Sequence, residues 1–190
     1  MNVPPPNTPP GEPAPLVEID GLRIGFRGHD GTLTDAVRDL SLTLAPGERL
    51  GIVGESGSGK SLTGRALLGL LPPAAQWSAR GLRFAGRDLL TMRAGERRRL
   101  CGAEIAMILQ DPKYSLNPVM TVARQMAEAF RLREPGLRGR ALRERIVAAL
   151  AAVGIDAPAR VADAYPHELS GGMGQRVMIA MMVSTGVRAC

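Results

Sequence analysis

The sequence predicts an α/β fold in which a region of strands, a glycine loop and a mostly helical region follow one another along the chain. Three observations support this prediction. Apolar and polar residues alternate within 16–44, a pattern typical of half-buried strands. A glycine-rich stretch at 54–61 separates a short apolar run from a segment of helical character. From residue 121 onward the apolar residues recur at helical spacing, and the chain shows no internal repeat.

The N-terminal half is expected to hold strands around one short helix. Two half-buried strands lie within 16–44, separated by a turn at 28–31. A third, short apolar strand over 50–53 leads directly into the glycine loop. The segment 61–71 is expected to be a helix that the Pro72-Pro73 pair ends, because proline lacks the backbone N–H that would continue it.

The later elements alternate weakly at first and are then helical. Weak alternation over 81–90 predicts a strand and a turn, and the charged segment 92–100 is expected to be helical. The continuous apolar run 105–109 is typical of a strand buried on both faces. Helical spacing over 121–164 predicts a small helical lobe, and a last helix is expected over 170–183, capped by the serine at its start.

Composition favours a globular protein and argues against several classes. Hydrophobic residues make up 45% of the chain and charged residues 22%, which excludes wholesale disorder and fibrous repeats. The net charge is +6, but all basic residues except Lys60 and Lys113 are arginines in an alanine-rich chain. We interpret this as a compositional bias, not a nucleic-acid patch. Cys101 and Cys190 lack the spacing of a metal site or a disulfide framework, and no apolar run is long enough to cross a membrane.

The glycine loop carries the first chemical motif. It reads GESGSGKS and matches GxxxxGK[ST] between a predicted strand and a predicted helix. The glycines let successive backbone N–H groups turn towards an anion, and the helix adds the positive end of its dipole. Lys60 is then the residue that reaches the β and γ phosphates of a nucleotide, and the Ser61 hydroxyl is a ligand for Mg²⁺. The candidate nucleotide-binding residues of the loop are Gly54, Glu55, Ser56, Gly57, Ser58, Gly59, Lys60, Ser61 and Leu62.

A second motif narrows the class of nucleotide-binding protein. Residues 169–172 read LSGG within YPHELSGGMGQR, which resembles the signature sequence of ABC-type ATPases. Small residues at a helix start present a hydroxyl, bare amides and the helix dipole to an anion. The resemblance implies that this anion is the γ-phosphate held by the opposite subunit, contacted by Leu169, Ser170, Gly171, Gly172 and Met173. Taken alone, LSGG is also compatible with an ordinary helix cap.

A third segment, IAMILQDP, looks like the Q-loop of the same superfamily. Its glutamine, Gln110, offers a carbonyl oxygen to Mg²⁺ or to the attacking water. The resemblance therefore makes Lys60 and Gln110 the candidate catalytic residues, and Ser61 and Gln110 the candidate metal ligands. The alternative for Gln110 is an exposed glutamine in a turn.

Longer strings resemble one branch of this superfamily. QDPKYSLNPVMTV and YPHELSGGMGQRVMIAM are similar to the ATPases of oligopeptide and dipeptide ABC importers, and the resemblance covers about 16–181. It implies a P-loop NTPase fold of the ABC type, with an antiparallel β subdomain and a helical subdomain, and ATP and Mg²⁺ as cofactors. It also makes Phe26, an aromatic before the loop, and Val37 candidates for contact with adenine. The alternative for Phe26 is a strand residue that faces the core.

The same resemblance implies an assembly at a membrane. The expected partners are integral-membrane permease subunits, a second ABC ATPase subunit in a homo- or heterodimer and, indirectly, an extracytoplasmic solute-binding protein. No direct contact with nucleic acid is expected, and the expected location is peripheral, at the cytoplasmic face of the inner membrane. Two other hypotheses are a non-hydrolytic fragment that binds nucleotide or a partner subunit, and a nucleic-acid-associated ABC ATPase.

On this interpretation the chain has four parts. A disordered, proline-rich tail (1–15) precedes a nucleotide-binding core (16–116), a helical subdomain (117–168) and the signature with its helix (169–190). In the family an apolar strand ending in Asp-Glu follows the signature helix, and this sequence reaches its last residue before such a pair. We therefore expect the C-terminal part of the core to be missing and these 190 residues alone to be inactive in ATP hydrolysis.

Two residues near the signature depart from the family pattern. His167 precedes the signature, whereas the histidine that relatives use lies beyond the Asp-Glu strand, so we interpret His167 as a packing or capping residue. Gly174 stands where relatives usually carry arginine. Glycine in a first helical turn costs about 1 kcal/mol relative to alanine.

Overall fold

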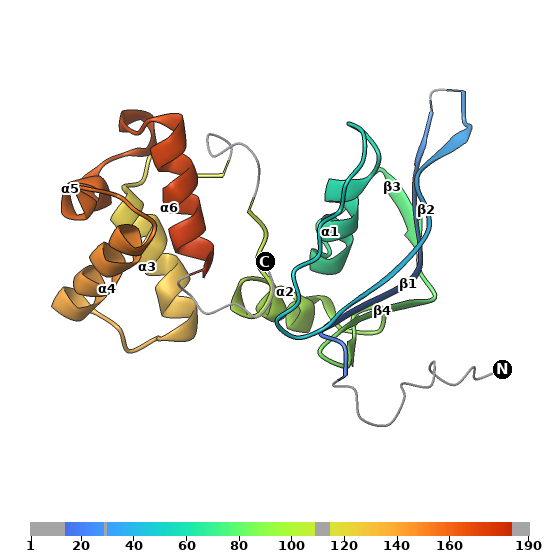
Figure 1. Ribbon diagram of the computed structural model, residues 1–190, viewed down its shortest axis with the longest axis horizontal. Helices are drawn as coiled ribbons and strands as arrows, with labels where there is room; N and C mark the ends of the chain where they lie inside the picture. The colour runs from blue at the N-terminus through green and yellow to red at the C-terminus, as the bar shows by residue number, and fades with distance from the viewer. Residues whose placement is uncertain (1–13, 29, 109–114, 184–190) are drawn as a thin grey trace. The chain divides into compact units, whose positions relative to one another are not determined.

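The computed structural model describes residues 14–28, 30–108 and 115–183, and the chain divides into two compact units, Met1–Arg97 and Arg98–Cys190 (Figure 1). The first unit holds an antiparallel sheet, one complete helix and the first residues of a second helix, and the second unit is helical. The elements in chain order are β1 (Val17–Arg27), β2 (Leu33–Leu44), α1 (Lys60–Leu68), β3 (Ala75–Ser78), β4 (Gly81–Phe84), β5 (Arg87–Asp88), α2 (Ala94–Ala103), α3 (Val122–Arg133), α4 (Gly139–Ala152), α5 (Pro158–Asp163), the 3₁₀ helix η2 (Pro166–Glu168) and α6 (Gly171–Val183).

The sheet is built around β1. Its strands follow the order β2-β1-β4-β5, and β3 pairs with the C-terminal part of β1 while β4 pairs with the N-terminal part. The strands predicted for 16–44 and 81–90 are present, and the pairings within the sheet, as far as its residues are described, are antiparallel, as the family resemblance implied. The alternating apolar residues of β1 and β4 are buried, with Ile19, Leu22, Ile24, Leu82 and Phe84 at 2% exposure or less. β3 was not predicted, because a four-residue strand with two polar members carries too little alternation to be recognised.

Helix α1 ends earlier than the sequence predicts. It was expected to continue to residue 71, but it stops at Leu68 because Gly69 adopts a left-handed conformation with φ of 68°. The amide of Gly69 donates to the carbonyl of Ala66, and the amide of Leu70 donates to that of Arg65. This glycine C-cap acts before the proline pair is reached.

Two predicted strands do not form within the described residues. The segment 50–53 has no strand structure, and Leu50, Ile52 and Val53 are 47%, 48% and 96% exposed. The described part of 105–109 makes only an isolated bridge, between Cys101 and Ile105. An apolar run becomes a strand only where a neighbour accepts its backbone hydrogen bonds, and neither segment has such a neighbour among the described residues.

The second unit has a core to which its four α-helices after residue 115 contribute. The apolar residues of these helices recur every three or four positions, so each presents one apolar face. Thr121 caps α3 by accepting from the amide of Arg124, as expected for the start of a helical lobe. The core residues are Leu116, Val122, Met126, Ala127, Phe130, Leu142, Ile146, Ala149, Leu150, Ile155, Val161, Ala162, Val177, Ala180 and Met181.

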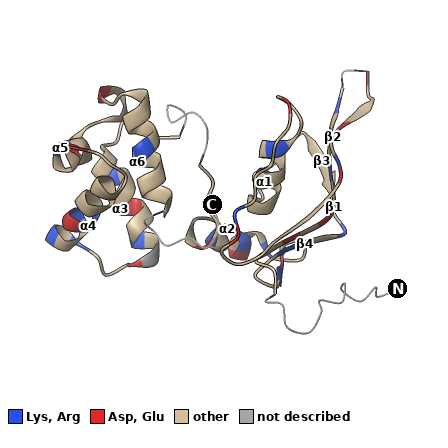
Figure 2. Cartoon of the chain, in the orientation of Figure 1, with Lys and Arg blue, Asp and Glu red and all other residues tan. Residues whose placement is uncertain are grey.

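Charged residues are spread over both units (Figure 2). On α4, Arg140 pairs with Glu144 one turn along, at 2.7 Å. Arg143 makes a bidentate pair with Asp163 of α5, at 2.8 and 2.7 Å. Several arginines are therefore already engaged with carboxylates. Within the described ranges, no helix has the length and apolar content required for a membrane crossing.

Candidate functional site

The glycine loop turns sharply into helix α1. Gly57 and Gly59 both have φ of 84°, a conformation that residues with a Cβ rarely adopt. Between them, the amide of Ser58 donates to the carbonyl of Glu55 at 3.2 Å. Helix α1 begins at Lys60 with no side-chain cap. The backbone amides of its first turn, which form the positive end of the helix dipole, are therefore not occupied by a capping side chain.

Gly59 is also the point at which the loop touches the sheet. A Cβ at this position would lie 2.5 Å from a methyl group of Val37 and 2.7 Å from the carbonyl oxygen of Ala36. Strand β2 thus passes directly beside the loop, and only glycine fits between them. Thr63 anchors the same point from the helix side, because its buried hydroxyl donates to the Gly59 carbonyl at 3.2 Å. Sequence reasoning did not identify Thr63, which carries no motif of its own.

Lys60 lies over the loop that precedes it. Its Nζ donates to the carbonyls of Gly54 and Glu55, at 2.7 and 2.6 Å, and to the Ser58 hydroxyl at 3.3 Å. None of these three oxygen atoms belongs to a charged group. No carboxylate among these partners therefore competes with an anionic ligand for the ammonium. The loop residues 54–58 are exposed, as a ligand-binding loop has to be.

Of the other predicted nucleotide-binding residues, Val37 and Ser61 lie at the loop, whereas Phe26 lies on strand β1. Val37 is buried against Gly59, and Ser61 is exposed in the first turn of α1. Phe26 is half-buried on β1, opposite Thr34 of β2 and Ala75 of β3, and no described contact brings it to the loop. Gln110 lies outside the described residues.

The signature motif forms the start of helix α6. The Ser170 hydroxyl accepts from the amide of Met173 at 3.3 Å, which confirms that Ser170 caps the helix. Gly171 and Gly172 are exposed, and a Cβ on either would have no heavy atom within 4 Å. Gly174, one turn further, is buried. The helix start therefore presents a hydroxyl and two bare glycines outward, while one face of the following turns, including Val177 and Met181, is buried.

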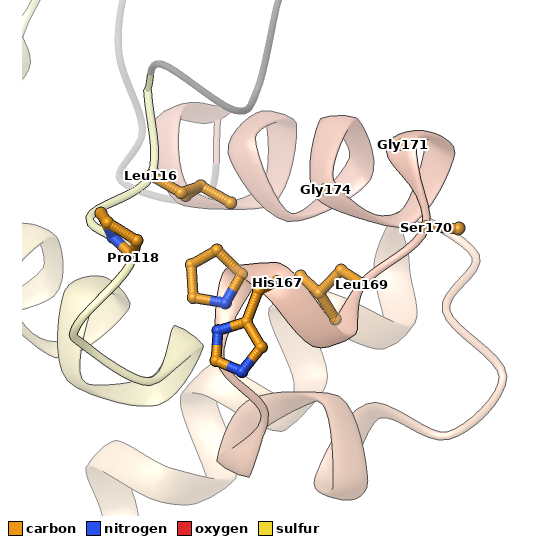
Figure 3. A pocket seen from close by; sticks show the side chains of 8 residues that line it. Leu116, Pro118, His167, Leu169, Ser170, Gly171 and Gly174 are labelled. Carbon is orange, nitrogen blue, oxygen red and sulfur yellow. The ribbon is translucent and has the colours of Figure 1, made fainter.

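A cavity of about 390 Å³ lies beside this motif (Figure 3). Leu116 and Pro118 approach it from the segment before α3, and His167 and Leu169 from the segment before α6. His167 is exposed and stacks on Tyr165 with ring centroids 5.6 Å apart, and its packing or capping role stays a prediction. Leu116 and Pro118 were not predicted from the sequence to belong to a site. The lining residues are Leu116, Pro118, Pro166, His167, Leu169, Ser170, Gly171 and Gly174.

Gln125 fixes the segment that lines this cavity. It is 8% exposed, and its Oε1 accepts from the amide of Asn117 at 2.9 Å. Its Nε2 donates to the carbonyls of Asn117 and Met120, at 3.0 and 2.9 Å. A glutamine on the buried face of a predicted amphipathic helix is the signal that would have found it.

Comparison with known proteins shows the family of this chain. Residues 37–189 match the family model described as ABC transporter. Over 171 residues the chain is 47% identical to a putative peptide import ATP-binding protein of Brucella abortus (strain 2308), and over 169 residues it is 46% identical to a dipeptide transport ATP-binding protein of Escherichia coli (strain K12). These alignments cover 90% and 89% of this chain but 51% of each relative, so the chain spans about half the length of the curated relatives it matches.

Solved structures show the fold. A dimeric ATP-binding cassette bound to ADP and Pi, in a post-hydrolysis state, superposes with a TM-score of 0.79 at 22% identity, covering 90% of this chain and 70% of that one. A component of an ABC transporter complex from Clostridium perfringens superposes with a TM-score of 0.63 at 24% identity, covering 91% of this chain and 62% of that one. These likenesses confirm the fold class predicted from the sequence.

Proposed function

The chain belongs to the ABC transporter family, and from that premise we propose that it is the nucleotide-binding part of the ATP-binding subunit of a peptide importer. The observation that carries this proposal is the position of Lys60, whose ammonium lies over an exposed loop and contacts only uncharged oxygen atoms. The peptide and dipeptide transport proteins to which the chain is 46–47% identical support the substrate class.

The phosphates of ATP are the ligand that this loop suits. The uncapped start of α1 and the exposed loop supply N–H donors and the positive end of a helix dipole. Lys60 adds a full positive charge, and Val37 closes the side of the loop that faces β2. In this role the chain holds the phosphates in one position, which is the main task of a protein in phosphoryl transfer.

Mg²⁺ fits the same end of the helix. The Ser61 hydroxyl is an exposed oxygen donor in the first turn of α1, and Mg²⁺ prefers oxygen ligands. When bound, the ion neutralises charge on the β and γ phosphates. We propose Ser61 and Gln110 as its protein ligands.

The signature is proposed to act on the nucleotide of a second subunit. The Ser170 hydroxyl and the two exposed glycines at the start of α6 present donors to solvent, which suits an anion brought by another chain. The proposed partners are therefore a second ATPase subunit and, in the complete protein, permease subunits at the cytoplasmic face of the membrane and a solute-binding protein outside it.

Titration with a fluorescent ATP analogue in the presence of Mg²⁺ tests the loop. Lys60→Ala should weaken binding by about tenfold or more, because it removes the charge-assisted hydrogen bonds to the phosphates. Arg38→Ala is the matched control, since Arg38 is exposed on β2 next to Val37 and its loss changes the net charge equally. Equal affinities of the wild type and Lys60→Ala would overturn the assignment.

A second experiment tests the signature in trans. Ser170→Arg adds bulk at the exposed start of α6, so it should abolish ATP-dependent association with a full-length partner ATPase in size-exclusion chromatography. Nucleotide affinity of the monomer should stay unchanged in this variant. Ser170→Ala, which removes the hydroxyl without adding bulk, should weaken association less. Loss of nucleotide affinity in monomeric Ser170→Arg would contradict the trans arrangement.

A further inference from the structure

The far end of helix α1 is held by one arginine. We infer that Arg97 is a positioning residue for the nucleotide site, because its guanidinium fixes the C-terminal carbonyls of the helix whose first turn carries Lys60 and Ser61. The inference rests on the proposed function, since it concerns the same site. It adds a residue that lies 37 positions beyond Lys60 in the sequence and belongs to none of the motifs.

The hydrogen bonds place Arg97 at the end of α1. Its Nη2 donates to the carbonyls of Ala66 and Leu67, the latter at 3.2 Å. These carbonyls lie in the last turn of α1, where no following turn of helix can satisfy them. The amide of Gly69 shares the Ala66 carbonyl, so a glycine cap and an arginine act on the same helix end.

Gly69 makes room for this contact. A Cβ at Gly69 would lie 3.0 Å from Nε of Arg97 and 3.2 Å from its Cζ, so the guanidinium packs against the bare backbone of the cap. The left-handed φ of Gly69 favours glycine, and the approach of Arg97 leaves little room for a Cβ at the same position. Arg97 is therefore half-buried and packed against the cap, and it is not a freely extended surface side chain.

Arg97 also ties α1 to the sheet. Its Nη1 donates to the carbonyl of Leu89 at 3.4 Å. Leu89 is 1% exposed, and its amide donates to the carbonyl of Leu82 on β4 at 2.8 Å. The guanidinium thus joins the end of α1 to a fixed part of the first unit.

The architecture of α1 explains why it needs such an anchor. The helix has nine residues, and a helix this short is marginal by itself. Its first turn must stay open to the phosphates, so no side chain caps it there. A cation at the other end opposes the negative pole of the helix dipole and stabilises the helix without covering the site. Arginine suits this task better than lysine, because its planar fork donates to several carbonyls at once.

Three variants of the full chain test the inference. Arg97→Ala removes the fork, Arg97→Lys keeps the charge, and Arg98→Ala removes an exposed arginine at the next position as a control for charge. The first measurement is hydrogen exchange at the amides of Gly69 and Leu70, which report the end of α1. The second is the affinity for a fluorescent ADP analogue.

We expect Arg97→Ala to exchange these amides about tenfold faster and to bind ADP several-fold more weakly. Arg97→Lys should recover part of both losses, and Arg98→Ala should match the wild type. Millimolar guanidinium should restore affinity to Arg97→Ala while methylammonium, of the same charge, should not. A general loss of structure would not respond selectively to guanidinium, so this rescue separates positioning from folding.

The outcomes distinguish this inference from the proposed function. If Lys60→Ala abolishes ADP binding while Arg97→Ala binds and exchanges as the wild type does, the function stands and the inference is overturned. Rescue by methylammonium as well as guanidinium would also overturn it. If the wild type itself does not bind ADP, the proposed function fails, and the inference fails with it. If Arg97→Ala does not fold, Arg97→Lys decides by the same two measurements.

Discussion

Helices α1 and α6 both begin at a motif, but they are held in place in different ways. Helix α6 has thirteen residues, a serine cap and five buried residues, and it contributes to the core shared with α3, α4 and α5. Helix α1 has nine residues, no side-chain cap and three buried residues. Its position depends on contacts at its two ends, with Gly59 against β2 and Arg97 on the last turn.

This difference predicts which substitutions would displace each motif. The signature sits on a helix whose apolar face fixes it, so its exposed first turn is free to present bare glycines. The glycine loop has no such support from the segment before it, where Leu50, Ile52 and Val53 are exposed. Helix α6 should therefore be destabilised mainly by substitutions in the core. Helix α1 should be destabilised by substitutions that remove one of the close contacts at its ends.

Phe130→Ala should produce the largest effect. Phe130 lies on α3 in the core that holds α6 and is 1% exposed, so its truncation should lower the free energy of unfolding of the helical unit by about 3–5 kcal/mol. Far-UV circular dichroism in urea measures the helical transition, and the single tryptophan, Trp77 on β3, reports the first unit separately. Leu132→Ala, on the same helix but 76% exposed, should change little. Equal shifts in both variants would contradict the packing described here.

Gly59→Ala should have the next largest effect, at the other helix. Alanine there has to adopt a left-handed φ, at about 1–2 kcal/mol, and its Cβ would also meet the backbone of Ala36 at 2.7 Å. Gly57→Ala is the matched variant, since Gly57 has the same φ but no atom within 4 Å of its Cβ position. Thermal unfolding and affinity for a fluorescent ATP analogue should rank the wild type first, Gly57→Ala second and Gly59→Ala last. Indistinguishable variants would show that β2 does not constrain the loop.

The segment before α1 allows a third test, on the surface. Three apolar residues are exposed within 50–53, and we expect this segment to bind the dye ANS. Ile52→Asp should lower the dye fluorescence and raise solubility while changing the free energy of unfolding by no more than about 0.5 kcal/mol. Leu132→Asp alters an apolar residue outside this segment and should leave dye binding as it is. Unchanged fluorescence in Ile52→Asp would place the dye elsewhere.

The sequence predicted the elements whose partners lie close along the chain. The alternation within 16–44 found β1 and β2, which are joined by a short turn, and the helical spacing from 121 found α3 to α6. Both motifs were placed correctly at helix starts, because caps and glycine turns depend on neighbouring residues. The predicted family membership and fold class are confirmed by the comparisons.

Features that depend on contacts between residues far apart in the chain could not be predicted from the sequence. The strand predicted over 50–53 was wrong for the described structure, since an apolar run does not state whether a neighbour will pair with it. Arg97 is one of three consecutive arginines, so the sequence does not distinguish it from its neighbours. The structure shows that its guanidinium donates to carbonyls at the end of α1. Gln125 could have been singled out as a glutamine on the buried face of a predicted helix, but its backbone partners, Asn117 and Met120, could not be predicted. The adenine contacts proposed for Phe26 and Val37 stay predictions.

The smallest effect is expected at an exposed ion pair of the helical unit. Arg143 donates two hydrogen bonds to Asp163 across α4 and α5, and these bonds lower the pKa of the Asp163 carboxyl below its ordinary value of 3.8. Because the pKa is lowered in the folded state, the pair stabilises fully above 3.8 and loses this contribution as the pH falls through the lowered pKa. Asp163→Asn should therefore unfold at slightly lower urea than the wild type at neutral pH and at the same urea in strong acid, and added salt should shrink the difference. Asp156→Asn makes the same charge change at an exposed position for which the described residues provide no ion pair, and it is the matched control for the loss of one negative charge. A difference between wild type and Asp163→Asn that persists unchanged in strong acid would mean that the charge of Asp163 does not contribute the stability lost in the variant.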